Sequence, residues 1–149
     1  DEMIDKLDRA RNFQSAMGML RQLEFSLFDF KLHMKLHTGD QVQALMDSIR
    51  DEISLLKPPS YNKFQNGFAH IFAGGYAAGY YSYKWAEVLS ADAFFHFVDN
   101  GIFEEEIASS YRDIILGLGG SESMSVLFEK FMGRELDTTG LLRLNGIAA

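Results

Sequence analysis

Apolar residues recur every three or four positions through most of this 149-residue chain, which is the spacing of an amphipathic helix. The pattern begins at Met3, and a break near Arg11 and Asn12 predicts a short helix followed by a long, strongly buried helix over residues 13–36. The sequence contains no segment with the alternating pattern of a good strand, no repeat and no low-complexity segment. We therefore expect an all-α fold.

Glycine, proline and capping residues predict the limits of the other helices. Gly39 is expected to end the first long helix and Asp40 to cap the next one, which covers residues 41–56 and is terminated by Pro58 and Pro59. The residues after the prolines lack a helical period and predict a connector. The remaining expected helices cover residues 76–100, 104–116, 121 or 123 to 131 or 132, and 141–144. The sequence thus predicts about six helices with one glycine-rich loop.

Charge and composition exclude several classes of partner and chemistry. The formal net charge is −7, the isoelectric point is near 5.0 and the basic residues are scattered, so neither nucleic acid nor an anionic membrane is an expected partner. The absence of cysteine excludes a thiolate nucleophile and a cysteine metal site. No apolar run approaches the ~18 residues that span a bilayer, and the first residues do not resemble a signal peptide. We expect a soluble, cytoplasmic protein.

The stretch from Phe68 to Ser90 is the most unusual part of the sequence, because it combines glycines with a dense set of aromatic residues. Gly74, Gly75 and Gly79 stand where a helix is expected to begin. Each glycine costs roughly 0.5–1 kcal/mol relative to alanine within a helix. A structural or functional reason for these three glycines is therefore expected.

Three tyrosines follow at positions that share one face of a helix. Tyr76, Tyr80 and Tyr83 are related as i, i+4 and i+7, and His70 precedes the glycines. A phenol keeps its proton at neutral pH and donates a hydrogen bond to an oxygen that gains negative charge, and a neighbouring histidine donates in the same way. This set suits a hydrolytic site in which another group supplies the nucleophile. The alternative is structural, because tyrosines at this spacing also pack a core or an interface with the hydroxyl at its edge.

Other motifs favour structural roles. His33 and His37 have the i, i+4 spacing of a metal pair, but the glutamate of the zinc-protease HExxH motif is missing, which favours surface histidines. The acidic run of residues 104–106 suits the positive end of a helix dipole. The glycines of residues 117–120 lack the Lys-Ser/Thr and the preceding strand of a phosphate-binding loop. A metal site at His33 and His37 remains an alternative.

Four segments of the chain resemble the thimet-oligopeptidase family of zinc endopeptidases. The most specific of them contains the histidine, the glycines and the tyrosines described above. The matching segments are residues 12–29, 68–92, 119–121 and 131–134. The resemblance covers nearly the whole chain.

This resemblance implies an enzyme whose helices enclose a deep channel that admits only short peptides to a zinc ion. In the family, zinc is held by the two histidines of an HExxH helix and by a glutamate of the next helix. The present sequence contains no HExxH motif. We therefore expect residues 1–149 to be a single C-terminal helical fragment of the catalytic domain, whose partners are short peptides and the N-terminal part of the same protein. Alone, it is expected to bind no zinc and to be inactive.

The resemblance also assigns roles to single residues. His70 together with Tyr80 or Tyr83 would polarise the scissile carbonyl and stabilise the oxyanion, and Tyr76 would contact the peptide backbone. The three glycines would allow the loop to close over the substrate. A non-catalytic helical module that binds peptides is the alternative function, and an HExxH motif upstream in the parent gene would distinguish the two.

Overall fold

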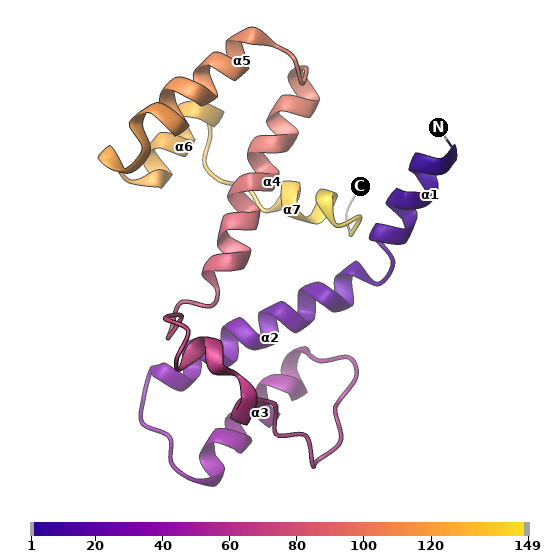
Figure 1. Cartoon of the computed structure of the whole chain (residues 1–149), viewed down its shortest axis with the longest axis vertical. Helices are drawn as coiled ribbons and strands as arrows, with labels where there is room; N and C mark the ends of the chain where they lie inside the picture. The colour runs from indigo at the N-terminus through magenta and orange to yellow at the C-terminus, as the bar shows by residue number, and fades with distance from the viewer. Residues whose placement is uncertain (1, 148–149) are drawn as a thin grey trace. The chain divides into compact units, whose positions relative to one another are not determined.

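The computed structural model describes residues 2–147, and every regular element within this range is a helix (Figure 1). The all-α prediction is therefore confirmed. The α-helices are α1 (Glu2–Arg11), α2 (Ser15–His33), α3 (Asp40–Ile53), α4 (Ser82–Asn100), α5 (Glu105–Ser110), α6 (Met124–Met132) and α7 (Thr139–Leu144). Shorter elements are the 3-10 turns η1 (Phe64–Gly67), η2 (Ala69–Ile71) and η4 (Gly119–Ser121) and the π-helical turn η3 (Tyr111–Leu116). Within residues 2–147, no helix is both long and apolar enough to cross a membrane.

The chain forms two compact units, and the boundary falls inside α4 between Trp85 and Ala86. The first unit contains α1 to η2, the glycine-rich loop and the first turn of α4. The second unit contains the rest of α4 and the elements that follow it. That both units belong to one catalytic domain of a larger protein stays a prediction.

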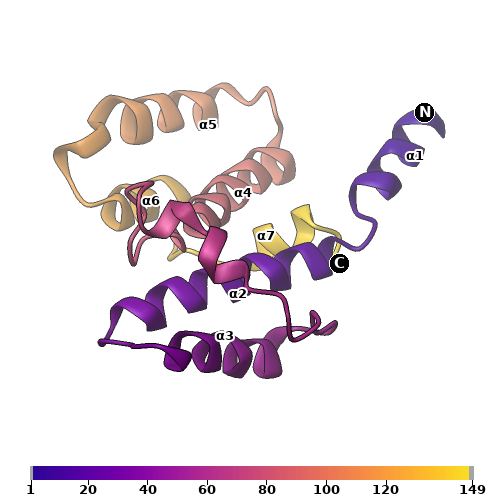
Figure 2. The same ribbon diagram turned by 60° about the horizontal axis from the view of Figure 1, so that its bottom comes forward.

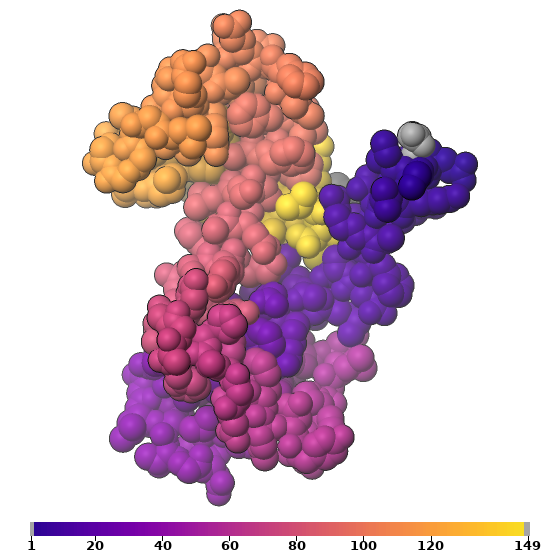
Figure 3. Space-filling model, viewed as in Figure 1, coloured from indigo at the N-terminus to yellow at the C-terminus, as the bar shows by residue number. Residues whose placement is uncertain are grey.

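The predicted break between the first two helices is confirmed. Gln14 has a left-handed backbone conformation, with φ at 55°, immediately before α2 begins. This residue interrupts the helical path, so that α1 points away from α2. No residue of α1 is buried, and α1 stands clear of α3 in the ribbon and space-filling views (Figures 1 and 3).

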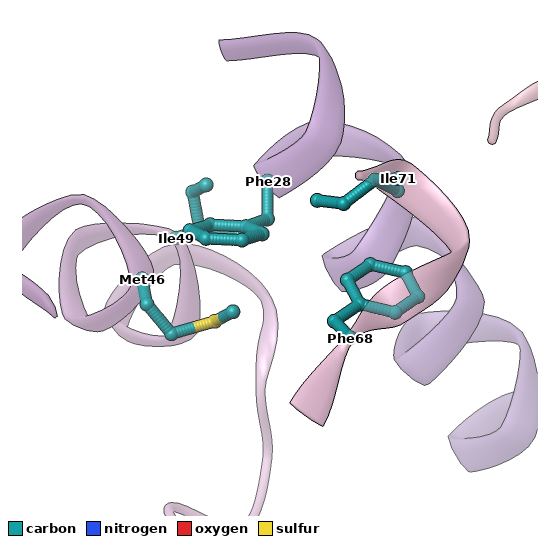
Figure 4. Close-up of a cluster of buried hydrophobic side chains, with 5 residues drawn as sticks. All are labelled: Phe28, Met46, Ile49, Phe68 and Ile71. Atoms are coloured by element: carbon teal, nitrogen blue, oxygen red, sulfur yellow. The ribbon is translucent and has the colours of Figure 1, made fainter. Parts of the chain in front are cut away.

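The core of the first unit lies between α2, α3 and the turns η1 and η2. Its buried side chains are Phe28 of α2, Met46 and Ile49 of α3, Phe68 between the two turns and Ile71 of η2 (Figure 4). α2 and α3 lie side by side (Figures 1 and 2), because α3 is apolar along one face only and buries that face. The segment that precedes the glycine-rich loop is therefore fixed to the helical core.

A buried ionic cluster supports the same packing. Glu24 of α2 is 2% exposed, and its carboxylate accepts hydrogen bonds from Arg50 Nε at 3.1 Å and Ser54 Oγ at 2.7 Å. Arg21 Nη1 donates to the same carboxylate at 2.6 Å. Arg50 also donates to Asn62 Oδ1 at 3.1 Å, so the connector after α3 joins the cluster.

In the second unit, α4 packs against the α5–η3 segment and α6. The buried core consists of Ala93 of α4 and Phe128, Phe131 and Met132 of α6. Beside it, Asp92 is buried and accepts two hydrogen bonds from the Arg134 guanidinium, at 2.9 and 2.5 Å. The segment between α6 and α7 is therefore held on α4.

Several predicted helix limits are wrong, while others are confirmed. α2 ends at His33 and α3 at Ile53, three residues before the predicted ends in each case, and Gly39 precedes α3 instead of capping α2. The helix predicted over residues 104–116 is divided into α5 and the π-helical turn η3, and Gly117 after it still has a right-handed helical backbone conformation. The end of α4 at Asn100 and the end of α6 at left-handed Gly133 are confirmed.

The Glu24 cluster predicts a stability that depends on pH. Burial alone would raise the pKa of Glu24, but hydrogen bonds from Ser54, Arg50 and Arg21 outweigh burial and lower it below its ordinary value of 4.5. A lowered pKa in the folded state stabilises the protein above the unfolded-state pKa, and this contribution disappears as the pH falls through the folded-state pKa.

We expect Glu24→Gln to destabilise the protein by about 3 kcal/mol at neutral pH, because Arg50 would remain buried without its carboxylate. Urea unfolding at pH 7 and at pH 3 measures this difference, which should shrink at the lower pH. Asp47→Gln is the control, because Asp47 is an exposed carboxylate beside the same arginine. An equal effect of both substitutions would contradict the prediction.

Candidate functional site

The predicted helix start in the glycine–tyrosine stretch is wrong. α4 begins at Ser82, six residues after Tyr76, and residues 76–81 form consecutive turns. Tyr76 and Tyr80 therefore do not share a helical face with Tyr83. The backbone N–H of Gly79 donates to Tyr76 O at 2.8 Å and that of Ser82 donates to Gly79 O at 3.0 Å, which folds the segment back on itself.

These turns nevertheless bring the tyrosine rings together. The ring centroids of Tyr76 and Tyr83 are 5.0 Å apart, and those of Tyr80 and Tyr83 are 5.4 Å apart. His70, at the exposed surface of η2, lies 6.3 Å from the rings of both Tyr76 and Tyr80. We call these four residues the His–Tyr cluster.

The His–Tyr cluster rests directly on the core of the first unit. The buried ring of Phe68 lies 5.1 Å from the Tyr80 ring in an edge-to-face arrangement and 6.2 Å from the His70 ring. Phe25 of α2 packs against both Phe68, at 5.3 Å, and Tyr80, at 6.0 Å. The position of the cluster is therefore set by aromatic packing as well as by the backbone turns.

The tyrosine hydroxyls differ in their surroundings. Tyr80 donates a hydrogen bond to Gln22 Oε1 at 3.0 Å, and burial raises the pKa of Tyr80. Tyr83 is 43% exposed, and a hydrogen bond with Tyr76 is the main reason that its pKa is raised. Both phenols therefore keep their protons at neutral pH. Tyr83 is the more exposed side chain of the two.

The three glycines of the loop have different structural reasons. A Cβ on Gly74 would lie 2.8 Å from both Cα and the carbonyl oxygen of His70, so only glycine allows this close approach. Gly75 has a φ of +79°, which L side chains rarely adopt. A Cβ on Gly79 would meet its nearest atom at an ordinary 3.5 Å. Two of the three glycines are thus required by the loop conformation seen here.

Asp29 of α2 also belongs to the candidate site, although it was not among the residues predicted from the sequence. Its side chain is fully buried, and its two carboxylate oxygens accept hydrogen bonds from the backbone N–H groups of Ala78 and Tyr80, each at 2.9 Å. His33 Nδ1 lies 3.0 Å from the same carboxylate. The available signal was an acidic residue between two phenylalanines in the middle of a strongly apolar helix.

His33 and His37 do not share a helical face, because α2 ends at His33. His33 Nδ1 faces Asp29, and His37 Nδ1 lies 2.9 Å from the carbonyl oxygen of Lys35. Over residues 2–147, no group of three or more His, Asp or Glu side chains is arranged to hold a metal ion. The described residues therefore do not fit a zinc centre of the kind that the family resemblance implies.

A separate pocket of the first unit, with a volume of ≈ 650 Å³, lies between the N-terminal half of α2 and the segment after α3. Arg21, Glu24 and Ser54 line it together with apolar side chains such as Met17 and Leu56. None of its lining residues belongs to the His–Tyr cluster.

The all-helical fold agrees with the fold that the family resemblance implies. Residues 1–147 match the sequence model of the family that is described as Peptidase family M3. The chain belongs to this family.

Individual relatives support the same assignment. The chain is 47% identical over 148 residues to oligopeptidase A of Escherichia coli (strain K12), an alignment that covers 98% of this chain and 22% of the relative. It is 41% identical over 155 residues to an Arabidopsis thaliana protein named probable cytosolic oligopeptidase A, covering 100% of this chain and 22% of that protein. With saccharolysin of Saccharomyces cerevisiae (strain ATCC 204508 / S288c) the identity is 32% over 153 residues, covering 99% of this chain and 21% of the relative. The chain thus spans about a fifth of the length of these relatives.

The glycine geometry predicts unequal effects of alanine at two positions of one loop. Gly74→Ala should destabilise the loop by about 1–3 kcal/mol, because the new methyl group must push the His70 backbone away. Gly79→Ala should change stability by less than about 0.5 kcal/mol, because its Cβ has room. Thermal unfolding of both variants measures the difference, and similar losses for the two would show that the close approach at His70 is unimportant.

Proposed function

We propose that this chain is the C-terminal segment of a metallo-oligopeptidase that hydrolyses short peptides, and that it contributes hydrogen-bond donors for the substrate and for the oxyanion. Membership of peptidase family M3 supports the class of reaction. The observation that carries the proposal for this segment is the His–Tyr cluster, in which one imidazole and three phenols are gathered around a loop that needs glycine at two positions.

Peptide hydrolysis places negative charge on the carbonyl oxygen when water adds to the carbonyl carbon. A preorganised neutral donor stabilises that charge more than it stabilises the uncharged substrate, and one such donor is typically worth about 3 kcal/mol. Tyr83 suits this role because its side chain is exposed and its raised pKa keeps the proton in place; its hydroxyl would exchange its bond with Tyr76 for one with the substrate. His70 is exposed beside the same rings and is proposed as a second donor.

Tyr80 and Tyr76 are proposed to have supporting roles as well as substrate contacts. In the structure, the Tyr80 hydroxyl donates to Gln22, so it must exchange this partner before it can donate to a substrate. Tyr76 packs on Tyr83 and shares a hydrogen bond with it, which orients the Tyr83 phenol. Tyr76 is proposed to contact the peptide backbone. Gly74, Gly75 and Gly79 are proposed to let the loop that carries Tyr76 close over the peptide.

We assign zinc and its ligands to the part of the larger protein outside this chain. The family resemblance implies the metal, but the sequence contains no HExxH motif and the described residues hold no suitable ligand group. We also propose a cytoplasmic location, which is supported by the similarity to the Arabidopsis protein named probable cytosolic oligopeptidase A.

Tyr83→Phe in the full-length protein should lower kcat for a quenched fluorescent peptide by about 10²-fold, because it removes one oxyanion donor and keeps the ring. Zinc content should not change, since the tyrosine is not proposed as a ligand. Tyr81→Phe is the matched control, because Tyr81 is a similarly exposed neighbour whose ring packs on Phe30 outside the cluster.

Unchanged turnover in the Tyr83→Phe protein would refute the donor role. A full-length protein that binds peptides but cleaves none, with or without added zinc, would instead favour the non-catalytic binding module.

A further inference from the structure

One face of α2 holds the tyrosine loop at three points. Asp29 accepts hydrogen bonds from the N–H groups of Ala78 and Tyr80, and Gln22, two helical turns earlier, accepts the Tyr80 hydroxyl. Residues 22 and 29 are related as i, i+7 and therefore lie on the same side of the helix. The backbone and the side chain of Tyr80 are thus oriented by groups that lie 51 and 58 positions earlier in the chain.

The turn that Asp29 holds is strained. Ala78 has a φ of 54°, a left-handed conformation that is unfavourable for a residue with a Cβ. Such a conformation persists only when its surroundings stabilise it. Two hydrogen bonds from one turn to a single buried carboxylate provide that stabilisation, because one side chain then satisfies both backbone donors of the turn.

Asp29 differs from the other buried carboxylate of α2. Glu24 is bound by the guanidinium groups of Arg21 and Arg50 and joins α2 to α3. The partners of Asp29 are two loop amides and the imidazole of His33. The two carboxylates lie on the same helix and are equally buried, but only Asp29 is bonded to the site loop.

We propose that Asp29 is a positioning residue of the peptidase site: its carboxylate holds the Ala78–Tyr80 turn and thereby sets where the phenols of Tyr80 and Tyr83 stand. This inference rests on the proposed function, since it assumes that these phenols contact the substrate. Asp29 itself is buried beneath the loop and touches no substrate. Gln22 assists by fixing the Tyr80 hydroxyl.

The test is Asp29→Asn in the full-length protein. Asparagine keeps the shape of the side chain, but its NH₂ group faces one of the two backbone donors, so one hydrogen bond is lost. Amide hydrogen exchange at residues 78 and 80 should accelerate by about tenfold or more, while exchange within α3 stays the same. The kcat for peptide cleavage should fall by about tenfold with a smaller change in KM, because the displaced donors act in the transition state.

Glu24→Gln is the matched control for the loss of a buried charge. It should lower the unfolding temperature, yet the exchange of the loop amides and kcat below that temperature should stay as in the unmodified protein. A second variant, Asp29→Asn with Ala78→Gly, should recover part of the loop protection and of kcat, because glycine adopts the left-handed turn without strain. The same glycine in the Glu24→Gln protein should not raise kcat.

These results separate the two proposals. Suppose that amide exchange at residues 78 and 80 is faster in the Asp29→Asn protein, but that the unmodified full-length protein cleaves no peptide. This result would refute the proposed function and would still support the inference that Asp29 holds the loop. Unchanged exchange and unchanged kcat in the Asp29→Asn protein would overturn the positioning role. Equal losses of kcat in the Asp29→Asn and Glu24→Gln proteins would overturn it too, because a general loss of stability would then explain both.

Discussion

The arrangement of the first unit depends on two buried carboxylates of α2 that face different partners. Glu24 binds arginines and fixes α2 to α3 and to the connector that follows. Asp29 binds backbone amides and fixes the loop that carries the tyrosines. Burying either charge is unfavourable unless every oxygen has a donor, so each carboxylate determines where its partners must lie. The helix that supports the fold is therefore also the helix that shapes the candidate site.

The tyrosine rings of the His–Tyr cluster meet although the helical face predicted for them is absent. The spacing of Tyr76, Tyr80 and Tyr83 predicted a helical face, and the structure has turns up to Ser82. The rings still meet, because the folded-back turns and the packing on Phe68 place them together. The amides of residues 78 and 80 donate to Asp29, which lies 49 and 51 positions earlier, so the local sequence around the tyrosines does not reveal their partner.

The features that were predictable have local causes. The break after Arg11 and the ends of α4 and α6 are marked by changes of period or by glycines, and the structure places them there. The all-α fold follows from the helical period itself. By contrast, Asp29 could have been noticed only as a charge within an apolar helix, and its bonding partners lie 49 and 51 residues away. Long-range hydrogen bonds of this kind leave no periodic trace in the sequence.

Phe68 belongs at once to the core of the first unit and to the ring contacts of the His–Tyr cluster. The same ring packs in the core between α2 and α3 and contacts the rings of His70 and Tyr80. The site consequently cannot be reshaped as an independent module. Any substitution that shifts these rings also alters a packed interior, so the aromatic contact that positions the loop also limits which substitutions the loop tolerates.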